Sequence, residues 1–151
     1  AGGFEMVLAC DLVVASREAR FGLPEVKRSL VAGAGGLLRL PQRLPYHLAM
    51  ELALTGEPLG AETAYQHGLV NRLVEPGQAL AGALELAATI AANGPLAVAA
   101  TKEILRRSLD WTEDEGWKQQ MDIMGPVFGS EDAREGAVAF TEKRPPRWPG
   151  K

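Results

Sequence analysis

The first 25 residues constrain the fold more than any other stretch, because a glycine pair opens a short helix there, an apolar run follows, and a Phe-Gly-Leu-Pro turn ends it. Gly2-Gly3 allow close backbone approach, and Phe4–Cys10 behind them predicts a short buried helix. Leu12–Ala15 is a compact apolar run, which predicts a buried strand. Arg20–Pro24 predicts an extended segment, since a residue before a proline is pushed out of the helical region.

Two acidic residues stand at the ends of this stretch. Glu5 lies just behind the glycine pair, and Glu25 follows a rigid Phe-Gly-Leu-Pro turn. If the chain folds back between them, two carboxylates and a helix N-terminus meet at one place. The free N–H groups of such a terminus can hold an oxyanion, and paired carboxylates suit acid/base work. Spacing alone also allows structural roles, with Glu5 capping a helix or pairing with Arg17 or Arg20, and Glu25 solvated in a loop.

The bulk composition is that of an ordinary globular chain. Its 151 residues suffice for one domain with a sizeable core, and 46% are hydrophobic while 23% are charged. The net charge of −3 supplies no basic surface for general nucleic-acid binding. No apolar run approaches the roughly 18 residues of a membrane span. We therefore expect neither nucleic acid nor a membrane as a partner.

Cysteine and histidine are scarce. Cys10 is the single cysteine, which excludes an internal disulfide and favours a reducing, cytoplasmic compartment, and we expect it to be a small buried residue. His47 and His67 are the only histidines, so no ligand cluster predicts a metal site, and both are expected at the surface. The chain starts inside a Gly-Gly turn, from which we expect that an N-terminal portion is missing.

The rest of the chain predicts one more strand, Leu69–Val74, among several helices. The expected helices are Tyr46–Leu54, Ala61–His67, Gln78–Ala92, Pro95–Ser108, a segment capped by Thr112 that reaches Met124, and Glu131–Glu142. We expect Gly125-Pro126 to break a helix, Pro41 to end a segment or lie in a bent helix, and Lys143–Lys151 to form an extended tail. Strands early and helices late predict an α/β region, residues 1–76, followed by a helical region, residues 77–151.

The glycine-rich turn Gly33–Gly36 does not predict a nucleotide site. A dinucleotide fingerprint needs a third glycine where this chain has Leu38, and a phosphate loop needs Gly-Lys-Ser/Thr, which is absent. The turn is therefore interpreted as a tight entry into a helix.

Four blocks in order resemble the crotonase (enoyl-CoA hydratase/isomerase) superfamily. They are AGGFEMVLACDLVVAS, FGLPEVKRSLVAGAGGLLRLP, LTGEPLGAETAYQHGLVNRLV and SEDAREGAVAFTEKRPPRW. The chain as a whole resembles the C-terminal part of a typical member. It implies an α/β fold in which the end of a ββα spiral core is followed by a helical subdomain that builds trimers, usually paired into hexamers.

The resemblance also implies roles for individual residues. Gly2 matches the glycine that donates an N–H to the thioester carbonyl, Glu5 and Glu25 match the pair that holds the water, and Glu25 matches the proton donor to the α-carbon. Gly33 matches a glycine whose backbone lies by that water. Near the C-terminus, Phe140 and Lys143 match residues that reach the CoA of a neighbouring subunit. No cofactor is implied, because CoA is part of the substrate.

Departures from the family pattern lie around the same site. Ala1 replaces a glycine, Phe4 is bulkier than usual and narrows the acyl pocket, Ala32 replaces a proline, and Leu37-Leu38 replaces a more polar pair. The second oxyanion donor and most adenine contacts belong to the family's N-terminal part, which this chain does not contain.

Three hypotheses follow. Both glutamates are present, which favours a hydratase that adds water to a 2-enoyl-CoA, because an isomerase generally needs only the residue at the Glu25 position. A double-bond isomerase or another crotonase-type reaction is the second hypothesis. The third is a non-catalytic oligomerising remnant.

Overall fold

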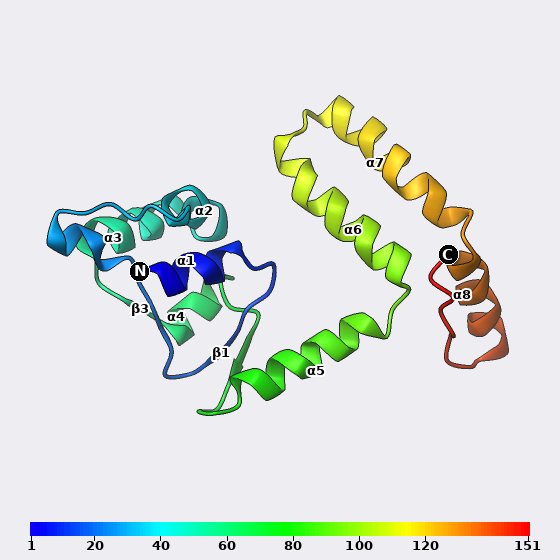
Figure 1. Ribbon diagram of the computed structural model, residues 1–151, viewed down its shortest axis with the longest axis horizontal. Helices are drawn as coiled ribbons and strands as arrows, with labels where there is room; N and C mark the ends of the chain where they lie inside the picture. Colours follow the sequence, from blue (N-terminus) through cyan, green and yellow to red (C-terminus); the bar gives the residue numbers. More distant parts are fainter. The chain divides into compact units, whose positions relative to one another are not determined.

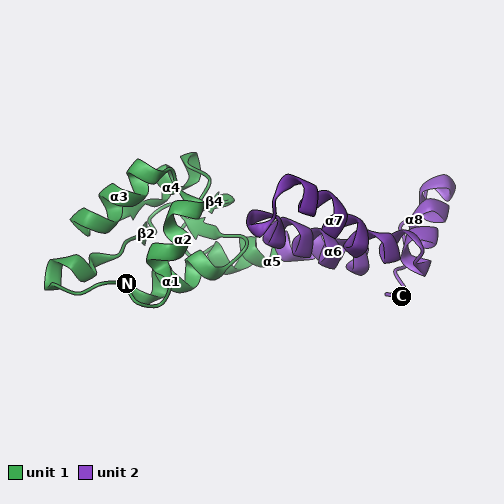
Figure 2. Cartoon of the chain, turned by 90° about the horizontal axis from the view of Figure 1, so that it is seen from above, with its two compact units in different colours: residues 1–85 green, residues 86–151 purple.

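The computed structural model describes residues 1–151, and the chain forms two compact units, residues 1–85 and 86–151 (Figure 2). The first unit holds short helices and strands, which can be followed along the chain in Figure 1. They are α1 Gly2–Ala9, β1 Val14–Ser16, β2 Arg20–Phe21, the 3₁₀ helix η1 Pro24–Arg28, α2 Gly36–Arg43, α3 Tyr46–Thr55, β3 Leu59–Gly60, α4 Ala61–Gln66 and β4 Arg72–Val74. Helix α5, Ala79–Ala91, crosses the boundary between the units.

The strands form two small sheets of two strands each. Strand β1 pairs with β4 in parallel, with Ala15 opposite Leu73, and β2 pairs with β3 antiparallel, with Phe21 opposite Leu59. The parallel pair joins segments nearly 60 residues apart. Next to it, Asn71 donates its backbone N–H to the Val13 carbonyl, and its side chain accepts from the Val13 N–H. These pairings return the chain to the end of α1.

The core of the first unit is made of apolar side chains from α1, β1, β2, α2, α3 and α4 and from the loops before η1 and after α4. Leu8, Leu23, Leu40 and Val70 are almost completely buried there. Helix α1 packs on α2, and α2 packs on α3. Burial of these side chains fixes the helix α1 and the turn before α2 relative to one another.

Several expectations about the first unit need correction. The first strand begins at Val14 rather than Leu12, because the Val13 N–H is bonded to the Asn71 side chain instead of a neighbouring strand. Cys10 is exposed rather than buried, since α1 ends at Ala9 and the chain leaves it in an extended conformation. Pro41 lies inside α2, in agreement with the second of its two expected settings.

The second unit contains α6 Pro95–Arg107, the 3₁₀ helix η2 Ser108–Asp110, α7 Glu113–Phe128 and α8 Glu131–Glu142. Helices α6 and α7 lie side by side around η2 (Figure 1), with the Arg107 guanidinium 5.2 Å from the Trp111 ring centre. Thr112 and Glu115 form the expected capping box at the start of α7. The Thr112 N–H bonded to Glu115 lowers the pKa of that carboxyl below its usual value.

The expected break at Gly125-Pro126 is wrong, because α7 continues to Phe128. A proline removes one N–H bond from a helix and crowds the preceding turn. Here Pro126 falls in the final turn, so the loss affects only the end of the helix, and Gly129 then ends it. The bonds of the preceding capped turns are sufficient to carry α7 through this position.

No single helix is long and apolar enough to cross a membrane, although α5 and α6 together would be by length and composition, with a sharp bend between them.

Leu40→Ala should weaken the first unit, because Leu40 is 1% exposed and joins α2 to the core. We expect the free energy of unfolding to fall by about 3 kcal/mol, as for other buried leucines. Urea unfolding followed by circular dichroism measures this change. Leu38→Ala on the same helix is the matched control, since Leu38 is 75% exposed and its truncation should leave the midpoint unchanged. Equal losses in both variants would contradict this description of the core.

Candidate active site

The N-terminus of α1 presents backbone N–H groups at an exposed position. Gly2 and Gly3 are exposed and form its first turn, where no carbonyl of the same helix accepts their N–H groups. The next two N–H groups, of Phe4 and Glu5, bond back to the Ala1 carbonyl. The helix dipole adds partial positive charge at this end. The terminus can therefore stabilise an oxyanion, which is the role that the sequence predicts for Gly2.

Glu25 reaches the same helix end from η1. Its Oε1 lies 3.7 Å from the Ala1 nitrogen, which donates to the Gly22 carbonyl, and the side chain of Glu25 is 19% exposed. The expectation that it could be a solvated loop residue is therefore wrong. Its Oε2 is buried without a hydrogen-bond partner in the protein. A buried carboxylate oxygen without a partner is unfavourable, and an ordered water, an ion or a catalytic role can account for it.

The position of Glu25 depends on how η1 packs against α3. Pro24 starts η1, and Gly56 ends α3 with a positive φ of 66°. A Cβ on Gly56 would stand 3.3 Å from the Pro24 Cα and 3.1 Å from atoms of the Lys27 side chain. The Lys27 ammonium also bonds Glu57 at 2.6 Å. Glycine at this turn thus lets η1 approach α3 and hold Glu25 in place.

Glu5 is buried, at 5% exposure, and points to the glycine-rich turn before α2. Its Oε1 accepts the N–H of Ala34 at 2.8 Å and that of Gly36 at 2.9 Å. Gly35, the residue before α2, has no side chain that could cap this helix, so the Glu5 carboxylate supplies the acceptor from another helix.

The alternative in which Glu5 pairs with an arginine of the first unit is not what the structure contains. Arg17 bonds instead to Glu75 and Glu62, which raise the pKa of its guanidinium. The alternative in which Glu5 caps a helix is correct. The capped helix is α2, about 30 residues further along the chain.

The glycine-rich turn is a tight entry into a helix, as expected. Gly35 has a φ of 91°, a left-handed conformation that disfavours other residues, and Arg39 bonds the Ala34 carbonyl across the turn at 3.1 Å. Gly33 is exposed and adjoins Ala34, whose N–H is held by Glu5. The backbone at Gly33 is thus fixed beside the Glu5 carboxylate.

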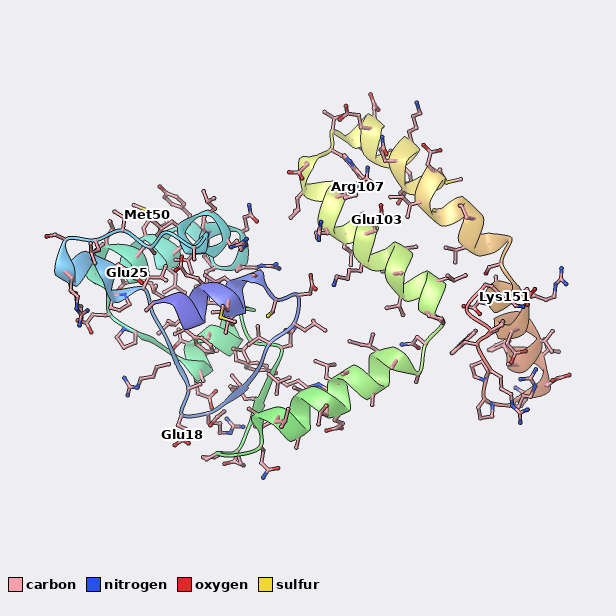
Figure 3. All side chains as sticks on the ribbon, viewed as in Figure 1. Glu18, Glu25, Met50, Glu103, Arg107 and Lys151 are labelled. Carbon is pink, nitrogen blue, oxygen red and sulfur yellow. The ribbon has the colours of Figure 1, made fainter.

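The first unit therefore brings four predicted residues to one region. Gly2 lies next to the residue that contacts Glu25, Glu5 follows one turn along α1, and Gly33 adjoins the turn bonded to Glu5. Two carboxylates beside a helix N-terminus can hold a water molecule, exchange protons with it and polarise a nearby carbonyl. Figure 3 labels Glu25 within this unit, together with the exposed Glu18.

The other two predicted residues belong to the second unit. Phe140 lies on α8 and is 84% exposed, and Lys143 is the exposed residue that ends this helix with a φ of 56°. Both side chains are available to a ligand at the surface of their own unit. A residue other than glycine rarely adopts the left-handed conformation at a helix end, so the positive φ of Lys143 must be stabilised by contacts of the neighbouring residues.

The chain after Lys143 is extended, as expected, and is fixed against α8. Arg144 makes two bonds to the Glu135 carboxylate at 2.6 and 3.0 Å, and the Arg147 N–H adds a third at 2.7 Å. These bonds, first that of Arg144 and then that of the Arg147 backbone, lower the pKa of Glu135 to about 2. Trp148 donates its indole N–H to the Ala92 carbonyl, and Gly150 donates to Asp132. The tail thereby fixes the end of α8.

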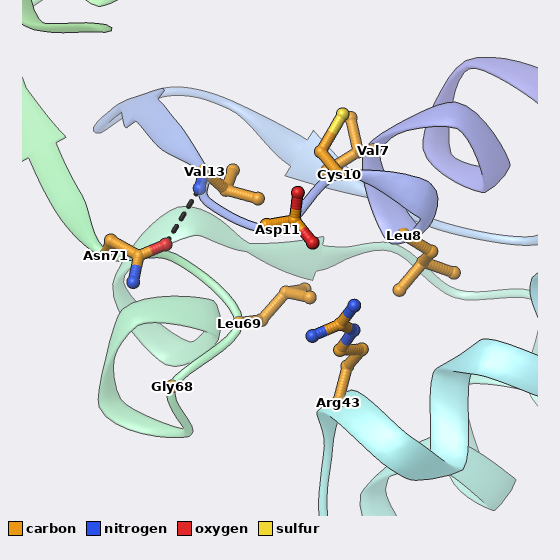
Figure 4. A pocket seen from close by; sticks show the side chains of 9 residues that line it. All are labelled: Val7, Leu8, Cys10, Asp11, Val13, Arg43, Gly68, Leu69 and Asn71. Atoms are coloured by element: carbon orange, nitrogen blue, oxygen red, sulfur yellow. Dashed lines mark hydrogen bonds between the residues drawn. The ribbon is translucent and has the colours of Figure 1, made fainter. Parts of the chain in front are cut away.

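A small cavity of about 50 Å³ lies at the opposite end of α1 (Figure 4). It is bordered by Cys10, Asp11, Arg43 and Asn71 and includes none of the predicted site residues. A second hollow of about 270 Å³ lies between α6 and α7 beside Trp111 and likewise contains none of them. No group of three or more His, Cys, Asp or Glu side chains is placed to hold a metal ion.

A family model for enoyl-CoA hydratase/isomerase matches residues 1–151. The chain belongs to this family. Solved structures of enoyl-CoA hydratases from Mycobacterium tuberculosis and Mycobacterium marinum are similar to it, with a TM-score of 0.98 for each and identities of 61% and 62%. Both comparisons cover 100% of this chain and 60% of the solved chain. The carnitinyl-CoA dehydratase of Proteus mirabilis is 43% identical over 154 residues, 99% of this chain and 59% of that protein.

These comparisons confirm the resemblance to the crotonase superfamily and the fold. The chain has the crotonase fold of the enoyl-CoA hydratase/isomerase family over about 60% of the length of the solved relatives. The four motif blocks identified in the sequence lie within the matched range.

Sequence reasoning missed the donors that hold Glu5, the N–H groups of Ala34 and Gly36. A signal for them was present, because the turn Gly33–Gly36 leads into a helix without Ser, Thr, Asp or Asn to cap it. An uncapped helix start requires an acceptor from elsewhere. Which acceptor supplies it depends on a contact between residues about 30 positions apart, which no local pattern reveals.

The pairing of Glu135 with the tail should make the stability of the second unit depend on pH. The folded-state pKa is about 2, below the usual 4.5, so the pairing stabilises the fold fully above about pH 4.5 and is lost as pH falls toward 2. The difference in melting temperature between wild type and Glu135→Gln should therefore shrink over that interval.

Thermal unfolding of the full-length protein at a series of pH values measures this difference. Glu131→Gln is the matched control on the same helix, because Glu131 pairs with Lys151 at 3.8 Å and is largely exposed. Its melting temperature should follow that of the wild type. A difference for Glu135→Gln that stays constant from pH 6 to pH 2.5 would contradict the assignment of the shifted pKa.

Proposed function

We propose that the full-length protein is an enoyl-CoA hydratase, which adds water across the double bond of a 2-enoyl-CoA thioester. The observation that carries this proposal is the placement of two glutamates near the start of α1. Glu25 lies beside the first residue of the α1 terminus, and Glu5 lies one turn along the same helix. Paired carboxylates next to N–H donors are the groups that hydration of a conjugated thioester requires.

Each group has a separate step in the proposed reaction. The Gly2 N–H binds the thioester oxygen, on which negative charge develops as water attacks the β-carbon. Glu5 accepts a proton from the attacking water, whose oxygen bonds to the β-carbon, while Glu25 delivers a proton to the α-carbon. The double bond is consumed, one water is added, and return of a proton from Glu5 to Glu25 resets the pair. Gly33 contributes backbone beside this water.

The named relatives support the reaction class. Hydratases and dehydratases catalyse the same change in opposite directions, because one adds the water that the other removes. Relatives of both names match nearly the whole of this chain, at 43% identity for a carnitinyl-CoA dehydratase and 61% for an enoyl-CoA hydratase. The shared chemistry is reversible transfer of water at a CoA thioester, so an acyl-CoA is the proposed substrate class.

The second unit would serve the CoA portion and the assembly. Phe140 and Lys143 are exposed at the end of α8, where an apolar ring and a cation suit the adenine and phosphates of CoA. In the proposed assembly, a homotrimer or a hexamer, they reach the substrate of a neighbouring subunit. Exposed apolar side chains on α6 and α7, such as Leu105, Trp117 and Met121, supply contact area for it.

Glu25→Gln should abolish hydration of crotonyl-CoA, and Glu5→Gln should reduce it by about 10²–10⁴-fold, since each removes a proton-transfer group. The loss of crotonyl-CoA absorbance measures the rate in the full-length protein. Glu18→Gln is the control, because Glu18 is an exposed glutamate of the same unit (Figure 3). Near wild-type turnover in Glu25→Gln or Glu5→Gln would show that the assigned roles are wrong.

The same assay separates the alternatives. A double-bond isomerase would turn over 3-enoyl-CoA faster than 2-enoyl-CoA and would tolerate Glu5→Gln. A non-catalytic oligomerising protein would give no turnover and no heat when an acyl-CoA is titrated into it. Hydratase activity requires faster conversion of the 2-enoyl substrate and its loss in both variants.

Lys143→Ala should raise the KM for crotonyl-CoA about fivefold and leave kcat unchanged, as expected when about 1 kcal/mol of exposed charge pairing is lost. Steady-state kinetics at several salt concentrations measure this, and the effect should weaken as salt screens the phosphates. Lys151→Ala is the control, since Lys151 is an exposed lysine of the same unit. An unchanged KM in Lys143→Ala would remove Lys143 from the proposed CoA contact.

A further inference from the structure

Glu5 has two carboxylate oxygens, and the structure engages them differently. Oε1 accepts both N–H bonds from the start of α2, at 2.8 Å from Ala34 and 2.9 Å from Gly36. Neither bond involves Oε2. A side chain with one oxygen held by two backbone donors cannot turn freely, so the direction of Oε2 is set by the position of Oε1.

The approach of Glu5 to α2 requires the absence of a side chain at position 36. A Cβ built on Gly36 would stand 2.8 Å from the Glu5 Cγ, 2.9 Å from its Oε1 and 3.3 Å from its Cδ. These three contacts are the nearest ones to that Cβ, and all are with Glu5. Gly36 itself has ordinary helical geometry, unlike the left-handed Gly35. The need for glycine at position 36 is therefore one of space around Glu5, not of backbone conformation.

If a side chain were added at position 36, the Glu5 carboxylate would move rather than the backbone of either helix. Leu40 fixes α2 and Leu8 fixes α1, each at 1% exposure, and the two helices pack directly on each other. A close-packed core resists a shift of either backbone. An added methyl group at position 36 would thus rotate the Glu5 side chain and break its two N–H bonds.

We propose that Gly36 is a positioning residue for the reaction: lacking a side chain, it lets α2 hold Glu5 Oε1 and leaves Oε2 directed at the reacting water. This inference rests on the proposed function for the part that concerns water. It assigns separate duties to the two oxygens, one to the fold and one to proton transfer. Gly36 acts through Glu5 and does not touch the substrate.

Gly36→Ala tests this assignment in the full-length protein, because it leaves the Glu5 carboxylate chemically intact. We expect kcat for crotonyl-CoA to fall by about 100-fold, the scale of an ångström-sized misplacement of a reacting group, with KM unchanged. The amide NMR signal of Ala34 should also move, since its acceptor is displaced. Gly60→Ala is the matched control, because a Cβ on this residue before α4 meets nothing within 4 Å.

A double-mutant cycle keeps the test decisive if Gly36→Ala lowers stability. In a Glu5→Ala background the atoms that crowd position 36 are removed, so Gly36→Ala should then leave the melting temperature unchanged. Destabilisation by Gly36→Ala that persists without the Glu5 side chain would overturn the inference. So would wild-type kcat together with an unmoved Ala34 signal in Gly36→Ala.

The outcome for Glu5→Gln separates this inference from the proposed function. If Glu5→Gln loses hydration while Gly36→Ala keeps it, the positioning role of Gly36 is wrong and the hydratase proposal stands. If Glu5→Gln keeps wild-type hydration, the proposed role of Glu5 in the reaction is itself wrong. Glutamine retains an acceptor for the two N–H groups, so its effect reports proton transfer and not loss of the contact.

Discussion

The carboxylate of Glu5 joins α1 to the first turn of α2, and the geometry of the candidate site depends on this contact. Helix α2 begins at a glycine-rich turn without a side chain able to cap it, so its first N–H groups need an acceptor. Glu5 supplies one from a buried position, where a charged group without partners would be costly. The contact therefore satisfies both the free N–H groups of α2 and the buried carboxylate of Glu5, each of which would be unfavourable without its partner.

The same contact explains how a short segment can hold a reactive arrangement. The apolar side chains of α1 and α2 fix the helices, the two N–H bonds fix Oε1, and η1 brings Glu25 to the start of α1 from the other direction. Glycines at positions 35, 36 and 56 provide the conformation or the space that these approaches require. Rigid elements thus place groups whose proposed work is proton transfer, with little dependence on mobile loops.

In the second unit, a network of hydrogen bonds and ion pairs fixes the exposed end of α8. Glu135 accepts bonds from Arg144 and from the backbone of Arg147, and the Trp148 indole anchors the tail to the Ala92 carbonyl. These contacts hold the residues on either side of Lys143, whose left-handed conformation ends α8. Surface pairs contribute little one by one, but a network that shares one carboxylate restricts the chain at several points.

The sequence by itself determined the family, most of the helices, the capping box at Thr112 and the acidic pair as a candidate site. These are local patterns or ordered motifs, which the chain carries wherever its parts come to lie. Only the tertiary structure decided that Glu5 binds α2 rather than Arg17 or Arg20, that Cys10 is exposed, and that α7 passes through Pro126. Those outcomes depend on contacts between distant residues, or on the balance between one lost bond and a whole helix, and neither is encoded in local spacing. Gly36 illustrates the difference, because its sequence setting indicates a turn while its neighbours in space give it the task of making room for a carboxylate.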